Sequence, residues 1–456
     1  MDLYQAALLD SFTVVTCSIL LWKYARISAF HPGVVYLFFH VFAFTFRVCA
    51  ILAGAPTLFT NWPGALSVSH AEIAWAANLA DIALVTMTAA WIHLGAADRR
   101  THSILRSNAH RDPKSAMLSE RVIKIVGAIA APIGIVALLY FVHIPALEVH
   151  RTDLGDWNSS SWTLIAQTWT GLVLLSLIYY YGFRKAFVVP MCVYLLIMAV
   201  QGFDRFRVVL PLIYLLLVWL SRKGRKWPPL GMVGAALAVS LVFFPMKTIG
   251  TMIQKGEPVS DIVDVARNEI ADATRGQAGD QMILDQFAST VSLVDHSDRY
   301  FYGTLYYPLL TMPVPRQWWP DKPALNWYQQ QITTRWRPMA LAGMVATLHG
   351  ESYANCGVLG IIIISYMLAY SLGRFYFAAL RTSYFSVYRF TFVMVTCNLI
   401  QVFRDGLISL VVFTLVNMTP LVAISVLSYL SFRRNRTGRS PSSSFVPERG
   451  KTVAQA

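Results

Sequence analysis

Apolar residues gather along this chain in blocks of about twenty, and this block length constrains the fold more than any other feature. A helix of about twenty residues crosses the ~30 Å hydrocarbon layer of a bilayer, whereas a membrane β-barrel alternates apolar and polar residues over segments of about ten. Of the 456 residues, 56% are hydrophobic and only 14% are charged; soluble domains carry about 25% charged residues. We therefore expect an all-α polytopic membrane protein, and exclude a soluble enzyme, a porin and a disordered protein.

Eleven segments are predicted as membrane spans from their length and hydropathy. They are Leu3–Trp22, Gly33–Ala55, Ala71–Ala96, Val122–His143, Trp162–Tyr181, Phe187–Gln201, Val208–Ser221, Leu230–Pro245, Val358–Phe377, Phe385–Phe403 and Leu407–Phe432. The sixth and seventh are short, and the polar stretch Gly202–Arg207 between them predicts a tight turn or a partly buried hairpin.

The distribution of basic residues predicts the orientation in the membrane. Lys and Arg number 38 against 24 Asp and Glu, a formal net charge of +14, and most of the basic residues lie in loops on one side of the predicted spans. Cytoplasmic loops collect Lys and Arg, so we expect the N-terminus outside and the C-terminus in the cytoplasm. Because the membrane topology explains the excess of basic residues, that excess does not indicate nucleic acid as a partner.

This topology divides the chain into four parts: spans 1–8 over residues 1–248, an extracytoplasmic (periplasmic) segment over 249–357, spans 9–11 over 358–432, and a disordered cytoplasmic tail over 433–456. Within the outer segment, Val259–Arg275 and Asp280–Asp295 have helical spacing of apolar residues. Tyr302–Pro338 is rich in Tyr, Trp and Pro, which suits the membrane interface or stacking on sugar rings. The histidines are dispersed and the cysteines unpaired in sequence, so neither a metal site nor a cofactor is predicted.

Arginines at the outer ends of spans are costly and typical of functional sites. Arg205, Arg207 and Arg404 occupy such positions, where the bias toward cytoplasmic basic residues predicts few of them. The guanidinium fork matches phosphate oxygens in pairs, so these residues predict a multivalent anion, for which a lipid-linked diphosphate is the natural class. Arg47 is equally well explained by an internal ion pair with Asp10 or Asp81.

Three segments in the second half of the chain carry a family resemblance. They are Tyr302–Thr304 with Pro315–Pro323 (PRQWWPDKP), Gly350–Gly360 (GESYANCGVLG) and Phe403–Gly406 (FRDG). In their residues, their order and their position relative to the outer segment, these segments resemble those of the oligosaccharide repeat unit polymerases, the Wzy-type O-antigen polymerases. The resemblance covers most of Phe187–Phe432.

The resemblance implies a GT-C-like membrane glycosyltransferase of the bacterial cytoplasmic (inner) membrane. Such an enzyme moves a polyprenyl-diphosphate-linked oligosaccharide onto a second lipid-linked repeat unit, building O-antigen or exopolysaccharide at the outer face, and can work with a chain-length regulator. The related O-antigen ligases carry an outer-loop His ten residues or so before a Gly, a spacing that His349 and Gly360 share.

A sugar–diphosphate donor already has a good leaving group, so cations that absorb the developing charge suffice. We assign this role to Arg316, Lys322, Arg404 and one of Arg205 and Arg207. The acceptor hydroxyl needs a base within hydrogen-bond reach, and Glu351 and His349 are the two candidates. The alternatives are that Glu351 caps a helix or pairs with a nearby Arg, and that His349 hydrogen-bonds the backbone.

Two other functions remain open. An O-antigen-ligase-like transferase differs only in its acceptor, a lipid A core sugar. A transporter or flippase for lipid-linked oligosaccharides would use the intramembrane charges as a pathway, but no inverted repeat of spans is visible and the charges gather at one face.

Overall fold

The computed structural model describes the chain except for residues 1, 26, 58–67, 106–115, 144–164, 202–205, 235–244, 256, 276–281, 298–299, 312–313, 315–317, 322–344 and 438–456. Over the described residues the protein is built from helices, and its β-structure is limited to an isolated bridge between Met117 and Ser386. The expected all-α membrane protein is therefore confirmed at this level.

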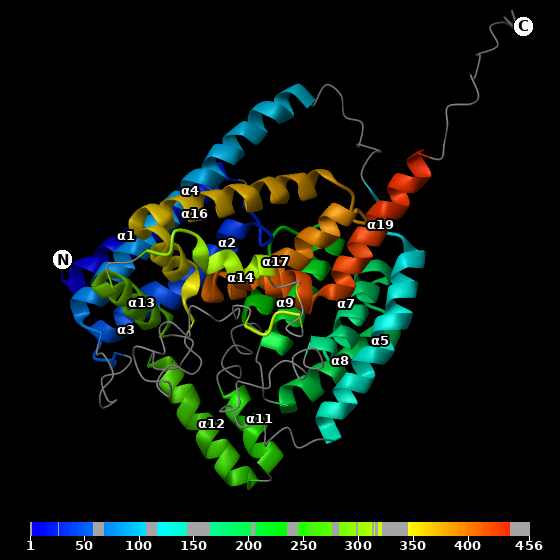
Figure 1. The fold of residues 1–456 in the computed structure, drawn as a ribbon, viewed down its shortest axis with the longest axis horizontal. Helices are drawn as coiled ribbons and strands as arrows, with labels where there is room; N and C mark the ends of the chain where they lie inside the picture. The colour runs from blue at the N-terminus through cyan, green and yellow to red at the C-terminus, as the bar shows by residue number, and fades with distance from the viewer. Residues whose placement is uncertain are drawn as a thin grey trace, which may run out of the picture.

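The first group of helices packs around α4 (His70–Leu105). The long helices α1 (Leu3–Tyr24) and α16 (Thr347–Arg381) both run along it (Figure 1). One further span consists of α2 (Pro32–His40), the π-helical turn η1 (Val41–Thr45) and α3 (Phe46–Leu52). Local sequence starts these helices: Asp2 and Gln5 form a capping box before α1, and Pro32 opens α2.

The second group has its own apolar core and lies beside the first (Figure 1). Its members are α5 (Glu120–His143), α7 (Trp169–Tyr181), α8 (Lys185–Gln201), α9 (Phe206–Lys223), α17 (Val387–Asp405) and α19 (Thr419–Thr437). Between α17 and α19, α18 (Leu407–Val411) packs Leu407 and Leu410 against the first core and continues into η5 (Val412–Asn417). Helices α16 and α17 contribute residues to both cores, so they join the two groups.

The outer segment begins as a helical hairpin of α11 (Met246–Lys255), which packs on α8, and α12 (Val259–Thr274), which packs on α11 at one end of the molecule (Figure 1). It continues with α13 (Ile283–Ser297), η4 (Thr304–Tyr306) and α14 (Tyr307–Thr311). The predicted helices over 259–275 and 280–295 are confirmed as α12 and α13. Helix α13 packs on α4 and α16 and is largely buried, so part of the outer segment belongs to the core.

Five helices of the described chain are long and apolar enough to cross a membrane, or six if a bent pair counts as one span. The predicted count of eleven is therefore not reached among these residues and stays a prediction; the span expected at 230–245 lies largely outside them. The span expected over 407–432 is instead broken near Met418, where its two halves meet at 74°. The boundary expected at residue 358 coincides with a kink at Cys356 and Gly357 inside α16.

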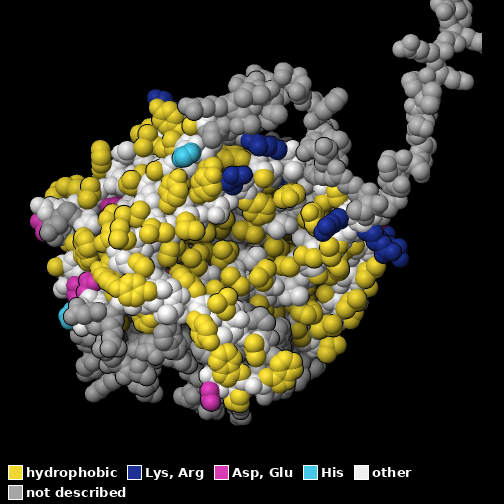
Figure 2. Space-filling view, turned by 45° about the horizontal axis from the view of Figure 1, so that its top comes forward, with side chains coloured by type: hydrophobic (Ala, Val, Ile, Leu, Met, Phe, Trp, Pro, Cys, Tyr) yellow, Lys and Arg dark blue, Asp and Glu magenta, His cyan; other side chains and the backbone are white. Residues whose placement is uncertain are grey.

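The outer surface of the bundle is apolar (Figure 2). Large hydrophobic side chains are exposed along α1, α5 and α16, including Phe12, Val136 and Met367. Contiguous apolar surface of this extent marks contact with lipid or another apolar partner. In the same view, described Lys and Arg side chains lie along one edge of the apolar area and Asp and Glu along the opposite edge. This separation is what the charge rule expects of a membrane protein, and the orientation itself stays a prediction.

A buried ion pair fastens the outer segment to the second span. Arg47 of α3 donates from Nε and Nη2 to the Asp285 carboxylate of α13 at 2.8 and 2.7 Å, and neither side chain is exposed. The expected internal ion pair of Arg47 is thus present, but its partner is Asp285 and not Asp10 or Asp81. The sequence did not point to Asp285 because that residue lies in the outer segment, 238 positions away.

We predict that Asp285→Asn strongly destabilises the fold, because the buried Arg47 guanidinium loses its counter-charge. Breaking one partner of a buried pair costs about 3–5 kcal/mol, which should lower the thermal midpoint of the purified protein in detergent. The exposed pair of Glu120 and Lys124 supplies the control: Glu120→Gln should leave the midpoint unchanged. Equal midpoints for the two variants would contradict the anchoring role of Arg47.

Candidate functional site

Parts of the three segments that carry the family resemblance meet at one place in the fold, which we call the motif junction; most of Pro315–Pro323 lies outside the described residues. It comprises Gly303 of the outer segment, Glu351 and Asn355 at the start of α16, and residues 404–407 between α17 and α18. Asn355 Oδ1 accepts the Gly303 N–H at 2.7 Å, and its Nδ2 donates to the Glu351 carbonyl at 2.8 Å. Segments about fifty residues apart in sequence are therefore joined directly.

Backbone hydrogen bonds extend this contact. The N–H groups of Phe301 and Tyr302 donate to the carbonyls of Ala354 and Asn355 at 2.9 and 3.0 Å. These carbonyls would otherwise lack partners, because the kink at Gly357 interrupts the helical pattern just beyond them. The loop before η4 thus completes the end of the first, short part of α16.

Glu351 connects α16 to the third segment. Its side chain is buried, and Oε2 accepts the N–H of Leu407, the first residue of α18, at 2.7 Å. A carboxylate is favourable at a helix N-terminus, where free N–H groups and the helix dipole attract negative charge. Gly406 has φ +97°, and a Cβ there would lie within 2.4 Å of the Glu351 carboxyl carbon and oxygens. Position 406, between α17 and α18, therefore requires glycine, both because φ is positive there and because a side chain would collide with Glu351.

The structure confirms a helix cap for Glu351, although of a different helix from the one expected. The cap sits on α18, not on the helix that follows the outer segment. This contact does not decide whether Glu351 is also a base, which stays a prediction.

Arg404 lies at the end of α17, beside this break. Nη1 donates to Asp405 Oδ1 at 3.0 Å, and the guanidinium lies over the ring of Phe206 with 5.2 Å to its centroid. The Asp405 carboxylate also accepts a hydrogen bond from Gln401. The side chain of Arg404 is about one-fifth exposed, and its contacts with Asp405 and Phe206 hold its position.

A small cavity of about 90 Å³ lies between α7, α8, α9 and α17, and Phe206, whose ring Arg404 covers, is on its wall. Phe206 and Arg207 of α9 both line it, together with apolar residues and the polar side chains Tyr194, Tyr214 and Asn398. Arg207 thus lines the cavity, and Arg404 lies over the ring of another lining residue, Phe206. The cavity is mostly apolar with a basic end, which suits a lipid chain with an anionic head.

His349 lies away from this cavity. It is 1% exposed and shares a 2.6 Å hydrogen bond between Nε2 and the Tyr36 hydroxyl, among the rings of Phe44 and Phe287. The expected partner, a backbone carbonyl, is therefore replaced by a side chain of α2. Neither His349 nor Glu351 lines the cavity beside Arg207, and the basic role of either residue stays a prediction.

Three of the seven predicted site residues cannot be placed. Arg205, Arg316 and Lys322 lie outside the described residues. Of the two candidates for the anion site, Arg205 and Arg207, the structure places Arg207 on the cavity wall.

Tyr306 of η4 belongs to the same neighbourhood. Burial raises the pKa of its phenol above the ordinary value, and the charge of Glu351 adds to the increase. The side chain therefore stays protonated at neutral pH. The sequence analysis did not single out this residue, although it directly follows the Tyr302–Thr304 segment.

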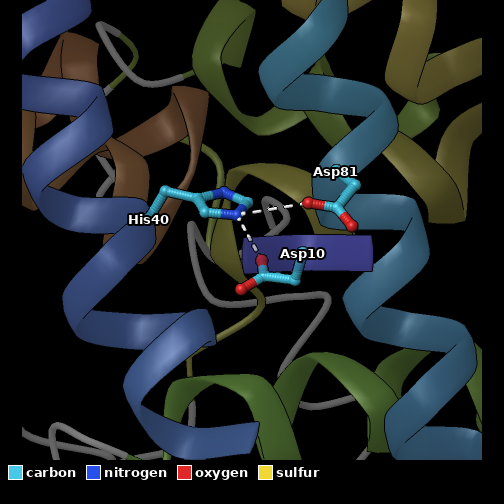
Figure 3. A group of neighbouring side chains, drawn as sticks. All are labelled: Asp10, His40 and Asp81. Atoms are coloured by element: carbon cyan, nitrogen blue, oxygen red, sulfur yellow. Dashed lines mark hydrogen bonds and ion pairs between the residues drawn. The ribbon is translucent and has the colours of Figure 1, made fainter. Parts of the chain in front are cut away.

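A second buried polar group lies in the first helix group. Asp10, His40 and Asp81 come from α1, α2 and α4 and point toward one another (Figure 3). The sequence analysis named the two aspartates only as possible partners of Arg47 and predicted no metal site. It missed the cluster because His40 is 30 residues from Asp10 in sequence and only helix packing brings the three together.

We predict that Gly406→Ala destabilises the protein more than Gly54→Ala. Both glycines have φ near +95°, so both substitutions carry the strain of a side chain in that region, about 1–3 kcal/mol, but only Gly406 has a neighbouring group, Glu351, in the space of the new Cβ. Thermal unfolding of the two purified variants measures the difference. Equal losses would mean that Glu351 does not press on Gly406.

Comparison of the chain with protein-family models, with curated proteins and with solved structures found no match. What the arrangement does is therefore argued from the residues themselves.

Proposed function

We propose that this protein is a membrane glycosyltransferase that polymerises polyprenyl-diphosphate-linked oligosaccharide repeat units into O-antigen or exopolysaccharide. The observation that carries the proposal is the motif junction. Residues 303, 351–355 and 404–406 belong to the segments that resemble repeat unit polymerases. They are joined by direct contacts, one of them through the adjacent Leu407, beside an apolar cavity that has Arg207 on its wall.

The proposed donor site follows from the chemistry of the cavity. The apolar lining takes the first part of the polyprenyl chain, and Arg207 and Arg404 bind the diphosphate through their guanidinium forks. The sugar then projects toward the motif junction. Arg316 and Lys322 of the outer segment are proposed to complete the diphosphate site.

In the proposed reaction, a hydroxyl oxygen of the acceptor sugar attacks the anomeric carbon of the donor. The bond from that carbon to the diphosphate oxygen breaks, and the electron pair leaves with the polyprenyl diphosphate. The arginines stabilise the added negative charge, and Glu351, or otherwise His349, accepts the hydroxyl proton.

The placement in a bacterial cytoplasmic membrane, with the junction at the outer face, belongs to the same proposal. It rests on the distribution of Lys and Arg between alternate loops. An O-antigen-ligase-like transferase and a flippase predict other products, so the test below separates them.

Deletion of the gene tests the function directly, because each candidate leaves a different polysaccharide. A polymerase mutant should make lipopolysaccharide capped with a single repeat unit. Core without any repeat unit would indicate a ligase, and absence of repeat units at the outer face of the membrane would indicate a flippase. Either of these two results would overturn the proposal.

In the same strain, Arg404→Ala should fail to restore polymer at normal protein level, and Arg404→Lys should restore it partly. A point ammonium keeps the charge but cannot bind the diphosphate through two parallel hydrogen bonds. Arg374→Ala is the matched control, because Arg374 is exposed at the other end of α16; it should restore polymer fully. Wild-type polymer from Arg404→Ala would remove the diphosphate role of this residue.

Substitutions at both ends of one hydrogen bond separate the base from the helix cap. If Glu351 is the base, Glu351→Gln keeps a hydrogen-bond acceptor for Leu407 but should slow polymer formation about 10²–10⁴-fold. Leu407→Pro removes one of the two N–H groups that Glu351 accepts, at a first helical position where proline is tolerated, and should retain activity. Leu407→Ala controls for the loss of the Leu407 side chain, which packs on the first core. The assay is polymer formation by purified protein with lipid-linked repeat units.

The opposite pattern, an active Glu351→Gln and an inactive Leu407→Pro, would assign Glu351 to the cap alone. His349→Ala, measured in the same assay, then shows whether the second candidate is the base.

A further inference from the structure

Asp10, His40 and Asp81 form a closed cluster inside the first helix group (Figure 3). Asp10 and His40 have no exposed surface, and Asp81 is 5% exposed. All three lie within helices that are candidate membrane spans. Charged groups in such surroundings are stable only when their charge is balanced.

The described chain leaves this charge unbalanced. Two carboxylates face one imidazole, and among the described residues no Lys or Arg forms an ion pair with either aspartate; the nearby Arg47 is bound to Asp285. Both oxygens of the Asp81 carboxylate and Oδ2 of Asp10 are buried without a hydrogen-bond donor. Unsatisfied anionic oxygens at this depth point to a bound cation.

The spacing of the three groups fits a single metal ion. His40 Nε2 lies 2.9 Å from Asp10 Oδ1 and 3.5 Å from Asp81 Oδ1, and the three ligand atoms all lie within 4.8 Å of one another. Zn²⁺ binds His nitrogen and carboxylate oxygen at about 2.0–2.2 Å in tetrahedral geometry, which places neighbouring ligand atoms about 3.3–3.6 Å apart. Small side-chain adjustments would therefore bring all three into coordination.

We propose that Asp10, His40 and Asp81 bind one divalent transition-metal ion, with Zn²⁺ the best match to two carboxylates and an imidazole. Two ionised carboxylates, a neutral imidazole and a divalent ion sum to zero charge, which is the state that a low-dielectric interior favours. A monovalent cation would leave one negative charge uncompensated.

The metal would act as a structural clamp. Its ligands come from α1, α2 and α4, so one ion joins three helices that hold much of the first apolar core. The same span that carries His40 continues to Arg47, whose ion pair anchors α13. The clamp thus stabilises the part of the bundle against which α16 packs, and it stands independently of the proposed glycosyltransferase function.

Metal analysis of the whole protein tests this proposal. The protein is expressed with Zn²⁺ in the medium, purified in detergent without chelators and analysed by elemental mass spectrometry. We expect about one zinc ion per chain in the wild-type protein. Asp10→Asn and Asp81→Asn should each contain at least about tenfold less zinc, because even the loss of a residue that only hydrogen-bonds a metal ligand lowers metal affinity about tenfold or more. Asp261→Asn, at an exposed position of α12, is the matched control and should keep the metal.

Expression of the wild-type protein with Co²⁺ in place of Zn²⁺ gives a second measurement, which needs no amino-acid substitution. Wild-type protein should show the visible absorption of Co²⁺ in tetrahedral nitrogen and oxygen coordination. Wild-type protein that contains no stoichiometric metal from either medium would overturn the proposal, and the cluster would then hold a shared proton. Metal that remains undiminished in both aspartate variants would overturn it equally.

Discussion

Arg47 and Asp285 lie side by side without exposed surface, and a large part of the structure depends on how such buried charges are neutralised. Removing an ion from water costs several kcal/mol, so each ionised group inside the bundle needs a partner from another helix. The pair joins α3 to α13 and thereby makes the outer segment part of the core. The long stretch between the spans is for this reason not a loop added to a finished bundle.

The same constraint explains the motif junction. A break in a helix inside an apolar bundle exposes N–H groups that must find acceptors. At Gly406 the acceptor is the carboxylate of Glu351, and at the kink near Gly357 the free carbonyls receive N–H groups from residues 301 and 302. At each helix break, the unpaired backbone groups thus form hydrogen bonds with another of the segments that carry the resemblance. This requirement explains why these segments lie together.

The two buried polar centres differ in how they are balanced. At the motif junction, the negative charge of Glu351 and Asp405 is met by helix N–H groups and by Arg404. In the cluster of Asp10, His40 and Asp81, the described residues supply only an imidazole. This difference is why the junction is explained by the chain itself, whereas the cluster points to a cation from outside it.

Much of the fold could be predicted from the sequence because helices in a membrane satisfy their own backbone and need only length and apolar composition. The helix over Leu3–Tyr24 was located from these signals, and the helix over Val259–Thr274 from the helical spacing of its apolar residues; the boundary expected at residue 358 falls at a kink inside α16. The bend near Met418 was not predicted, because continuous apolar composition is compatible with a straight or a broken helix.

The residue type and position of Arg404 identified it as noteworthy, because an ionisable side chain at the end of an apolar span is energetically costly, whereas Glu351 was singled out by the family resemblance. Their partners, Leu407 and Phe206, and the pairs of Arg47 with Asp285 and of His40 with two aspartates were decided only by the tertiary structure. Helix packing brings together side chains up to 238 residues apart. Hydropathy along the chain determines that a segment is buried in the membrane; which helix faces it, and therefore which charge neutralises which, depends on packing between helices that no local pattern encodes.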